Sequence, residues 1–240
     1  MIDFCILGSG ISGCTIANLL SKKHTIKIID KAKGVGGRSA NKKIGKTKSF
    51  DHGLQYFSSN EKDFNKLLIK LINKGVLKYW NGDHLDFSLI KKKNTKKIIG
   101  KKANNDLAKY FARNINKTLN TEIINIQFKK NHWEIYSKSK LFLSKNLILT
   151  FPFNQTKKIA KKYLSKRFLN LKVNMTPNLT LLIEGKLRER VLLSSLKFSS
   201  NIIAWAANEN SKKRFNGNKP LWTIQTTELF SKKYINTYKK

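Results

Sequence analysis

Three glycines at fixed spacing near the start of the chain are the residues best suited to chemistry. Gly8, Gly10 and Gly13 form a G-x-G-x-x-G pattern, and Asp30 ends the second apolar run after it. In this pattern the first glycine makes a tight turn, the second lets the backbone approach a pyrophosphate, and the third lets a helix pack closely on a strand. A carboxylate at Asp30 can accept both hydroxyls of an adenosine ribose. The spacing therefore predicts a dinucleotide-binding turn.

Such a turn needs a strand before it and a helix after it. The apolar run 4–7 is too short for a helix and stops at a glycine, which favours a buried parallel strand. After the glycines, Ile16, Leu19 and Leu20 recur at helical spacing. Residues 25–29 then predict a second strand, which completes a βαβ unit.

The start of the predicted helix has a role of its own. Its first turn, which includes Ile11 and Ser12, offers free backbone amides and a partial positive charge to the phosphates, so no basic side chain is needed there. A glycine-rich turn without a ligand is the structural alternative.

The charge of the chain is extreme. Its 240 residues carry a formal net charge of +35, which ordinarily indicates nucleic acid or an anionic membrane as a partner. The lysines, however, are spread along the whole chain in pairs and triplets, and the aromatic residues fall in apolar runs instead of between lysines. A solvated lysine-rich surface and a functional basic surface are both open interpretations. We follow the first, which predicts no specific nucleic-acid binding.

The two cysteines, Cys5 and Cys14, fall on the first strand and the first helix, where a small apolar side chain packs well. The sequence has no C-x-x-C motif and no Cys/His cluster at metal spacing, so it predicts neither a redox dithiol nor a metal site. No basic region precedes the first apolar run, and no stretch approaches ~20 consecutive apolar residues. We therefore expect a cytoplasmic protein without a membrane span.

Two further motifs decide which cofactor we expect. The first is Gly36-Gly37-Arg38, and the second is F-D-H-G-L-Q-Y-F at residues 50–57. A second glycine turn with an arginine fork suits a longer and more enclosed cofactor than a nicotinamide dinucleotide. In this order the motifs resemble the FAD-dependent amine oxidase superfamily and, within it, the bacterial renalase-like oxidoreductases.

The resemblance implies FAD as the cofactor and places residues 50–57 beside its isoalloxazine ring. In that family the backbone of an apolar residue after a T-x pattern contacts the cofactor; Thr121-Glu122-Ile123 matches the pattern, so the resemblance implies this role for Ile123, and a core isoleucine is the alternative. His52 is either a hydrogen-bonded structural residue or a group near the flavin. No catalytic residue is identified. The predicted cofactor-binding residues are Gly8, Gly10, Ile11, Ser12, Gly13, Asp30, Lys31, Gly37, Arg38, His52, Gly53, Gln55, Tyr56 and Ile123.

The predicted fold class is α/β: a Rossmann-type FAD-binding domain with a parallel sheet and a β-meander, together with a mixed α+β substrate domain. The resemblance assigns residues 1–57 and 101–153 to the first domain, and residues 58–100 and 154–240 to the second. Trp205 and Trp222 are either pocket residues or buried sheet aromatics. Local patterns predict helices over 61–77, 106–115 and 228–238, a hairpin over 122–136, strands over 147–151, 179–184, 202–212 and 221–226, and a short connection over 94–100.

The resemblance implies an oxidase-type flavin oxidoreductase. It would move a hydride from a small reduced substrate, either a dihydronicotinamide isomer or an amine, to the flavin and then to dioxygen. A final strand, Gly-Asp motif and helix that the family carries have no match before Lys240. We therefore keep a truncated chain, a non-catalytic dinucleotide-binding remnant, a partner that supplies the missing wall and a basic binding module as alternatives.

Overall fold

The computed structural model divides the chain into two compact units. Unit 1 comprises Met1–Arg38 and Leu107–Asn174, and unit 2 comprises Ser39–Asp106 and Met175–Lys240. These boundaries fall at other positions than the expected divisions after residues 57, 100 and 153, so the functional division into cofactor and substrate domains stays a prediction. The structure describes residues 1–45, 47–58, 60–87, 91–93, 97–185, 193–217 and 219–239.

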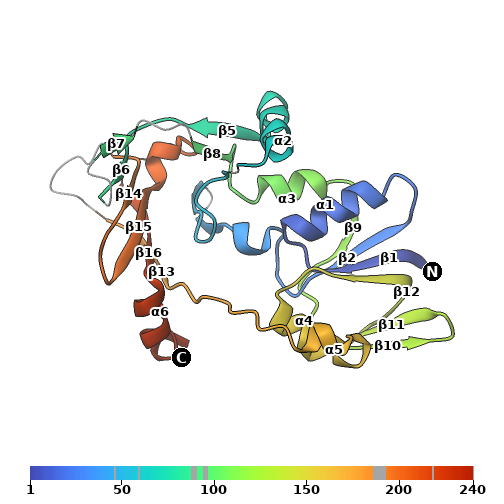
Figure 1. The fold of residues 1–240 in the computed structure, drawn as a ribbon. Helices are drawn as coiled ribbons and strands as arrows, with labels where there is room; N and C mark the ends of the chain where they lie inside the picture. The colour runs from blue at the N-terminus through green and yellow to red at the C-terminus, as the bar shows by residue number, and fades with distance from the viewer. Residues whose placement is uncertain are drawn as a thin grey trace. The chain divides into compact units, whose positions relative to one another are not determined.

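Unit 1 is built on a six-stranded sheet in the order β10-β11-β12-β1-β2-β9 (Figure 1). The pairs β12–β1, β1–β2 and β2–β9 are parallel, whereas β10, β11 and β12 pair antiparallel. This is the predicted combination of a parallel sheet and a β-meander. Its strands are β1 (Ile2–Leu7), β2 (Ile26–Ile29), β9 (Asn116–Thr118), β10 (Ile123–Lys129), β11 (His132–Ser137) and β12 (Leu141–Leu149).

Helices cover both faces of this sheet, with α1 on one face and α4 on the other (Figure 1). Cys5 and Leu7 pack in one cluster with Ala160 of α4, and Ile6 between them points to the opposite face because side chains alternate along a strand. The helical elements of unit 1 are α1 (Ile11–Leu20), η1 (Gly37–Ser39, which ends in unit 2), α3 (Asp106–Phe111, which begins in unit 2), α4 (Phe153–Ala160), η2 (Lys161–Tyr163) and α5 (Lys166–Leu169).

The buried face of α1 differs in part from the expected one: Ala17 is buried as expected, but Leu19 is not. Leu19 is 61 % exposed, and the buried residues are Gly13, Cys14 and Ala17. Small side chains therefore line the contact of the helix with the sheet, so the larger leucine is displaced toward solvent. The expectation that Cys14 packs as a small apolar residue is confirmed.

The expected helix over 106–115 ends early, at Phe111. The chain then tightens into a turn toward β9, where the ammonium of Lys117 donates to the carbonyls of Ala112 (2.5 Å) and Ile115 (2.6 Å). These carbonyls are satisfied by a side chain instead of a further helical turn. The expected hairpin is confirmed: Lys130 and Asn131 both have positive φ, as a two-residue hairpin loop requires.

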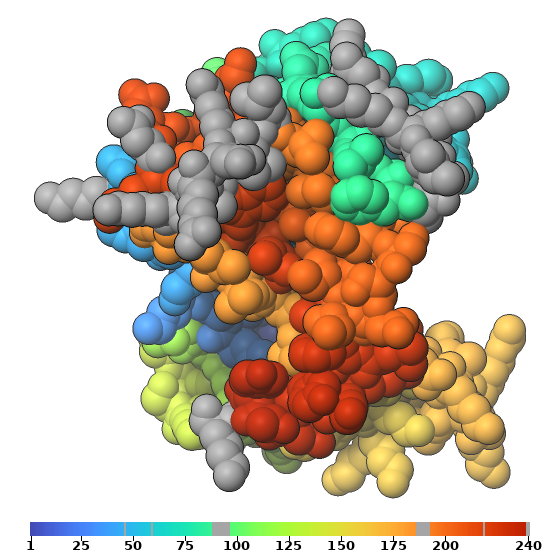
Figure 2. All heavy atoms as spheres, turned by 90° about the vertical axis from the view of Figure 1, so that its left-hand side faces the viewer, coloured from blue at the N-terminus to red at the C-terminus, as the bar shows by residue number. Residues whose placement is uncertain are grey.

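Unit 2 contains a second six-stranded sheet, in the order β13-β16-β15-β14-β6-β7, in which β14–β6 is the one parallel pair among the described strands. In the space-filling view the green residues around β6 and the orange residues around β14 lie side by side, although they are far apart in the sequence (Figure 2). The strands of this sheet are β6 (His84–Asp86), β7 (Lys91–Lys93), β13 (Thr180–Glu184), β14 (Ser195–Lys197), β15 (Ile203–Asn208) and β16 (Leu221–Thr226).

Two antiparallel two-stranded sheets, β3-β4 and β5-β8, and several helices complete unit 2. The connection expected over 94–100 is wrong for Lys97–Gly100, which forms β8 against β5, because a partner strand satisfies its backbone groups and Ile99 is buried; residues 94–96 lie outside the described residues. The helix expected over 61–77 is confirmed as α2 over Lys62–Asn73, and Gly75 follows it with φ +67°, but Leu77 already begins β5. The remaining elements are β3 (Lys42–Ile44), β4 (Lys48–Phe50), α2 (Lys62–Asn73), β5 (Leu77–Trp80), η3 (Glu209–Lys212), α6 (Glu228–Tyr234) and η4 (Thr237–Lys239).

Candidate dinucleotide site and a buried ion cluster

The first and third glycines of the motif are required by packing within unit 1. Gly8 has φ +112°, and a Cβ there would lie 2.5 Å from Oγ1 of Thr150. A Cβ on Gly13 would lie 2.1 Å from the carbonyl oxygen of Gly8 and 2.8 Å from the same hydroxyl. All three contacts are shorter than real Cβ atoms tolerate, so strand and helix approach this closely only with glycine at both positions.

Gly10 differs from its neighbours because the chain itself does not require a glycine there. Its φ of −68° and ψ of 178° are open to any residue. A Cβ would meet only Cα of Gly37, at 4.0 Å, which is ordinary contact. The space in front of Gly10 is therefore free for an approaching group, as the pyrophosphate interpretation requires.

The two glycine turns lie directly against each other. The amide of Gly36 donates to the carbonyl of Ser9 at 2.9 Å, and Gly10 and Gly36 form an isolated parallel bridge. Gly37 has φ +53°, and a Cβ there would be 3.1 Å from Cα of Gly10. Of the charged residues expected beside these turns, Arg38 and Lys31 are both exposed.

The carboxylate of Asp30 faces the first glycine turn. Its Oδ2 accepts from the amide of Ser9 at 2.5 Å and from the Ser9 hydroxyl at 2.7 Å, and its Oδ1 accepts from the amide of Ala32 at 2.8 Å. An ionised carboxylate has about four acceptor positions, so these three bonds leave room for a further donor. Sequence reasoning missed Ser9, although a hydroxyl inside a G-S-G turn was the available signal.

The N-terminus of α1 opens at the same place. The first bond of the helix runs from the amide of Cys14 to the carbonyl of Gly10, at 3.0 Å. The amides of Ile11, Ser12 and Gly13 therefore have no partner within the helix, and the helix dipole favours an anion in front of them. Free amides, open space at Gly10 and an acceptor at Asp30 together fit the diphosphate and ribose of a dinucleotide.

The side chain of Ile123 belongs to the core of unit 1. It packs against the cluster that contains Leu7, Ile29 and Ala160. This bears out the core interpretation, and the backbone contact with a cofactor that the resemblance implies stays a prediction.

The other four predicted residues, His52, Gly53, Gln55 and Tyr56, lie in unit 2. Burial lowers the pKa of His52, and the neighbouring Asp51 opposes that shift, so its imidazole is neutral at pH 7. Their contact with a cofactor stays a prediction.

Tyr56 belongs to a small aromatic cluster with a lysine. Its ring centroid lies 5.6 Å from that of Trp205, and the ammonium of Lys97 lies 4.0 Å from the Tyr56 centroid. Trp205 is partly buried, and its indole nitrogen donates to no group among the described residues. Trp222, the other tryptophan expected here, is also partly buried and lies on β16.

A cluster of buried charged side chains, which sequence reasoning missed, lies in unit 2. The ammonium of Lys212 is 3.0 Å from Oδ2 of Asp51 and 3.0 Å from Oε1 of Glu209, and all three side chains are almost fully buried. Arg214 donates to the same oxygen of Asp51. The interpretation of the lysines as a solvated surface is therefore wrong for Lys212. Nothing in its K-K-R context separates it from the exposed lysines.

The two carboxyl groups of this ion cluster have pKa values shifted in opposite directions. Burial alone would raise the pKa of Asp51, but Lys212 and Arg214 lower it to about 2. Burial raises the pKa of Glu209, and the attraction of Lys212 opposes that rise only in part. Oε1 of Glu209 accepts from Lys212 and from Thr223 at 2.7 Å, whereas Oε2 has no partner among the described residues.

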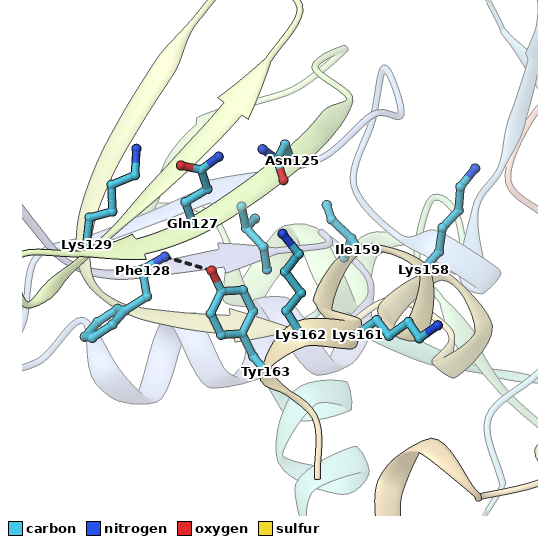
Figure 3. Close-up of a pocket in the computed structure, with 10 residues that line it drawn as sticks. Asn125, Gln127, Phe128, Lys129, Lys158, Ile159, Lys161, Lys162 and Tyr163 are labelled. Carbon is cyan, nitrogen blue, oxygen red and sulfur yellow. Dashed lines mark hydrogen bonds between the residues drawn. The ribbon is translucent and has the colours of Figure 1, made fainter. Parts of the chain in front are cut away.

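A separate hollow of about 570 Å³ lies in unit 1 between β10 and the α4–η2 segment (Figure 3). The amide of Phe128 donates to the hydroxyl of Tyr163 at 3.0 Å across one end of it. Its lysines are Lys129, Lys158, Lys161 and Lys162. No predicted site residue lines the hollow, so it is distinct from the glycine turns.

Comparison with known proteins supports the fold that these residues indicate. Residues 6–71 match the family described as NAD(P)-binding Rossmann-like domain. Among solved structures, putrescine oxidase bound to putrescine has a TM-score of 0.69 at 12 % identity, with 99 % of this chain and 78 % of that chain covered. A protein from Exiguobacterium sp. 255-15, provisionally named protoporphyrinogen oxidase, has a TM-score of 0.67 at 8 % identity, with 94 % and 77 % covered.

A tetracycline destructase, Tet(51), is also similar, with a TM-score of 0.58 at 12 % identity over 94 % of this chain and 56 % of that chain. At these identities the likeness establishes the fold, which is the predicted α/β class with a Rossmann-type domain. Within the described residues, no helix has the length and apolar character to cross a membrane, and no three His, Cys, Asp or Glu side chains are grouped to hold a metal ion.

Proposed function

We propose that this chain is a FAD-dependent oxidoreductase of the oxidase type. The observation that carries the proposal is the open space in front of Gly10, where two glycine turns meet the free amides of α1. The glycines at 8 and 13 are explained by packing, whereas packing does not require a glycine at position 10, and a ligand that approaches the backbone would account for it.

In this proposal each group of unit 1 has a definite task. The amides of Ile11, Ser12 and Gly13 bind the diphosphate, and the free acceptor position of Asp30 binds a ribose hydroxyl. Gly37 brings the second turn close to the first, and Arg38 provides a cation beside it. We extend the proposal to Lys31 beside these turns, to the backbone of Ile123, and to His52, Gly53, Gln55 and Tyr56 as contacts of the cofactor.

FAD, when bound, supplies a two-electron acceptor: a substrate C–H bond gives up a hydride, and dioxygen then takes the two electrons and two protons to form hydrogen peroxide. The chain's own part is to bind and orient. Because the His52 imidazole is neutral at pH 7, it can accept a hydrogen bond from a substrate N–H.

Two substrate classes are open, because the sequence resemblance and the structural likeness favour different ones. The renalase-like resemblance favours a reduced nicotinamide isomer, which loses a hydride without a general base. The structural likeness to putrescine oxidase instead favours an amine. A non-catalytic dinucleotide-binding remnant and a basic binding module remain the alternatives from other classes.

The test begins with cofactor binding. Protein refolded with FAD is freed of unbound flavin, and its visible absorbance and melting temperature are measured. We expect retained flavin and a higher melting temperature for the wild type, and neither for Gly10→Val, because its side chain would fill the phosphate approach. A wild type without either change contradicts the proposal.

The flavin-loaded protein is then mixed anaerobically with dihydronicotinamide isomers and, separately, with small amines. Bleaching of the visible flavin band by one class identifies the substrate class, and admission of air should restore the band. Retained flavin that no member of either class bleaches would support the non-catalytic alternative.

A further inference from the structure

Segment 51–55, the start of the second motif, is held in unit 2 by its carbonyl groups. The carbonyl of His52 accepts from Oγ1 of Thr180 at 3.2 Å. The carbonyl of Gly53 accepts from Nε2 of Gln225 at 2.8 Å. Both donors come from the sheet that contains β13 and β16, so this part of the segment is tied to that sheet.

The remaining carbonyls are held in the same way. Nδ2 of Asn104 donates to Leu54 O at 2.6 Å, and Nε2 of Gln55 folds back onto the carbonyls of Asp51 and Gly53. The peptide bonds of residues 51–55 are trans, so each amide N–H points away from the carbonyl of the preceding residue. The amides of residues 52–55 are thus directed away from these anchors, and no group among the described residues accepts from them.

The ion cluster fixes the beginning of this segment. Asp51 accepts from Lys212, from Arg214 and, at 3.0 Å, from the amide of Asn104. Lys212 also donates to Oε1 of Gln55 at 3.4 Å, so all three of its protons have acceptors. Arg214 in turn donates to the carbonyl of Gly100 and to Oδ1 of Asn104, which connects the end of β8 to the same cluster.

We infer that Lys212 and Arg214 are positioning residues, which hold segment 51–55 through the carboxylate of Asp51 so that its amides keep a fixed direction. Such an ion pair is a poor source of net stability, because removal of its charges from water offsets most of the attraction. The ion pair instead fixes geometry. The Asp51 carboxylate accepts from four donors, which come from Lys212, Arg214, the Asn104 amide and Asn41, so only one position of the carboxylate satisfies all of them.

The inference rests on the proposed function in one respect, namely that segment 51–56 contributes to FAD binding.

The variant Lys212→Met removes the ammonium with little change in volume. Lys213→Met is the matched control, since Lys213 is the next residue and is exposed. The dissociation constants of FAD and of ADP, which lacks the flavin ring, are measured for the wild type and both variants.

We expect Lys212→Met to raise the Kd of FAD at least about tenfold while that of ADP changes less than about twofold, and Lys213→Met to change neither. Equal changes for FAD and ADP, or no change, would overturn the inference, because a merely structural effect does not discriminate between the two ligands. If Lys212→Met does not fold, the double variant Asp51→Asn/Lys212→Met removes both charges of the pair. The dissociation constants of FAD and ADP are then measured for the double variant, with the same expected result.

A second readout does not depend on any ligand. The amide of Phe57, at the end of the same stretch, donates to the carbonyl of Ile98 at 2.7 Å, so its hydrogen exchange reports how firmly the stretch is held. We expect faster exchange in Lys212→Met than in Lys213→Met. Failure of the wild type to bind FAD or ADP refutes the proposed function, whereas unchanged exchange at Phe57 refutes this inference.

Discussion

Ser9 and Asp30 join the first glycine turn to the end of β2: the Ser9 hydroxyl donates to Oδ2 of Asp30 at 2.7 Å, and the Ser9 amide donates to the same atom at 2.5 Å. Ser9 is completely buried, and its carbonyl accepts from the amide of Gly36. One residue therefore connects the first turn, the second turn and the acid that the motif places near the ribose.

The two residues of this contact can be separated by mutation. Ser9→Ala loses a hydrogen bond to a charged group, so we expect the free energy of unfolding to fall by about 1.5–3 kcal/mol, with FAD affinity changed less than about threefold. Asp30→Ala should instead weaken FAD binding at least about tenfold, because the acceptor for the ribose is lost. Urea unfolding and FAD titration measure the two effects, and exposed Asp63→Ala is the control. Equal FAD affinities for Asp30→Ala and the wild type would contradict the role of this carboxylate.

Alanine substitutions at Gly10 and Gly13 should affect different properties of the protein. Gly13→Ala places a Cβ 2.1 Å from the carbonyl oxygen of Gly8, so the free energy of unfolding should fall by about 1–3 kcal/mol even without a ligand. Gly10→Ala meets only Cα of Gly37 at 4.0 Å and should change stability by less than about 0.5 kcal/mol.

Titration with FAD completes this comparison. Gly10→Ala should raise the Kd at least about tenfold, although the variant is as stable as the wild type. Normal FAD affinity in Gly10→Ala would show that the open space in front of this residue is not where the phosphates bind.

Glu209 should make the protein less stable as the pH rises. Its pKa is raised in the folded chain, so above the unfolded value of about 4.5 the unfolded state loses a proton that the native state keeps, and unfolding becomes easier until the pH passes the native pKa. Glu209→Gln retains an oxygen for Lys212 and Thr223 but has no titration. Its stability relative to the wild type should therefore increase as the pH rises above about 4.5, by about 1.4 kcal/mol for each unit of pKa shift, and should level off once the pH passes the native pKa.

Urea unfolding at several pH values, with exposed Glu228→Gln as the control, measures this difference. A constant difference between Glu209→Gln and the wild type as the pH rises above about 4.5 would mean that Glu209 is already ionised in the folded chain.

The buried thiols should be unreactive in the native protein. Burial raises the pKa of Cys14 to about 11 and that of Cys5 to about 12. At pH 8 a thiol of pKa 11 is about one part in a thousand thiolate, against about a tenth for pKa 9. A thiol reagent should thus label the native chain only as fast as it unfolds and label both cysteines in denaturant. Rapid labelling of the folded chain would contradict the burial of Cys14 against the sheet.

The sequence predicts the glycine turn well because every signal for it is local. The apolar run before Gly8, the helical spacing after Gly13 and the acid at Asp30 lie within one βαβ unit, and the structure has each where the motif requires it. The face of α1 is predicted less well, because Leu19 fits the helical period while the small residues Cys14 and Ala17 make the contact.

The ion cluster could not be predicted in this way. Asp51 and Lys212 are 161 residues apart in the sequence, so no local pattern links them, and lysine in a chain of this composition gives no local signal of burial. Strand β8 escaped prediction for the same reason: residues 97–100 form a strand because they pair with β5, which their own sequence does not reveal.

The place of β1 in its sheet has a consequence for synthesis of the chain. β1 pairs on one side with β2, which follows it closely, and on the other with β12, which ends at Leu149. During translation the second edge of β1 therefore stays open until the residues of β12, up to Leu149, have left the ribosome. An uncovered apolar strand edge is prone to wrong pairing, so production of this protein should respond to chaperones that hold nascent chains.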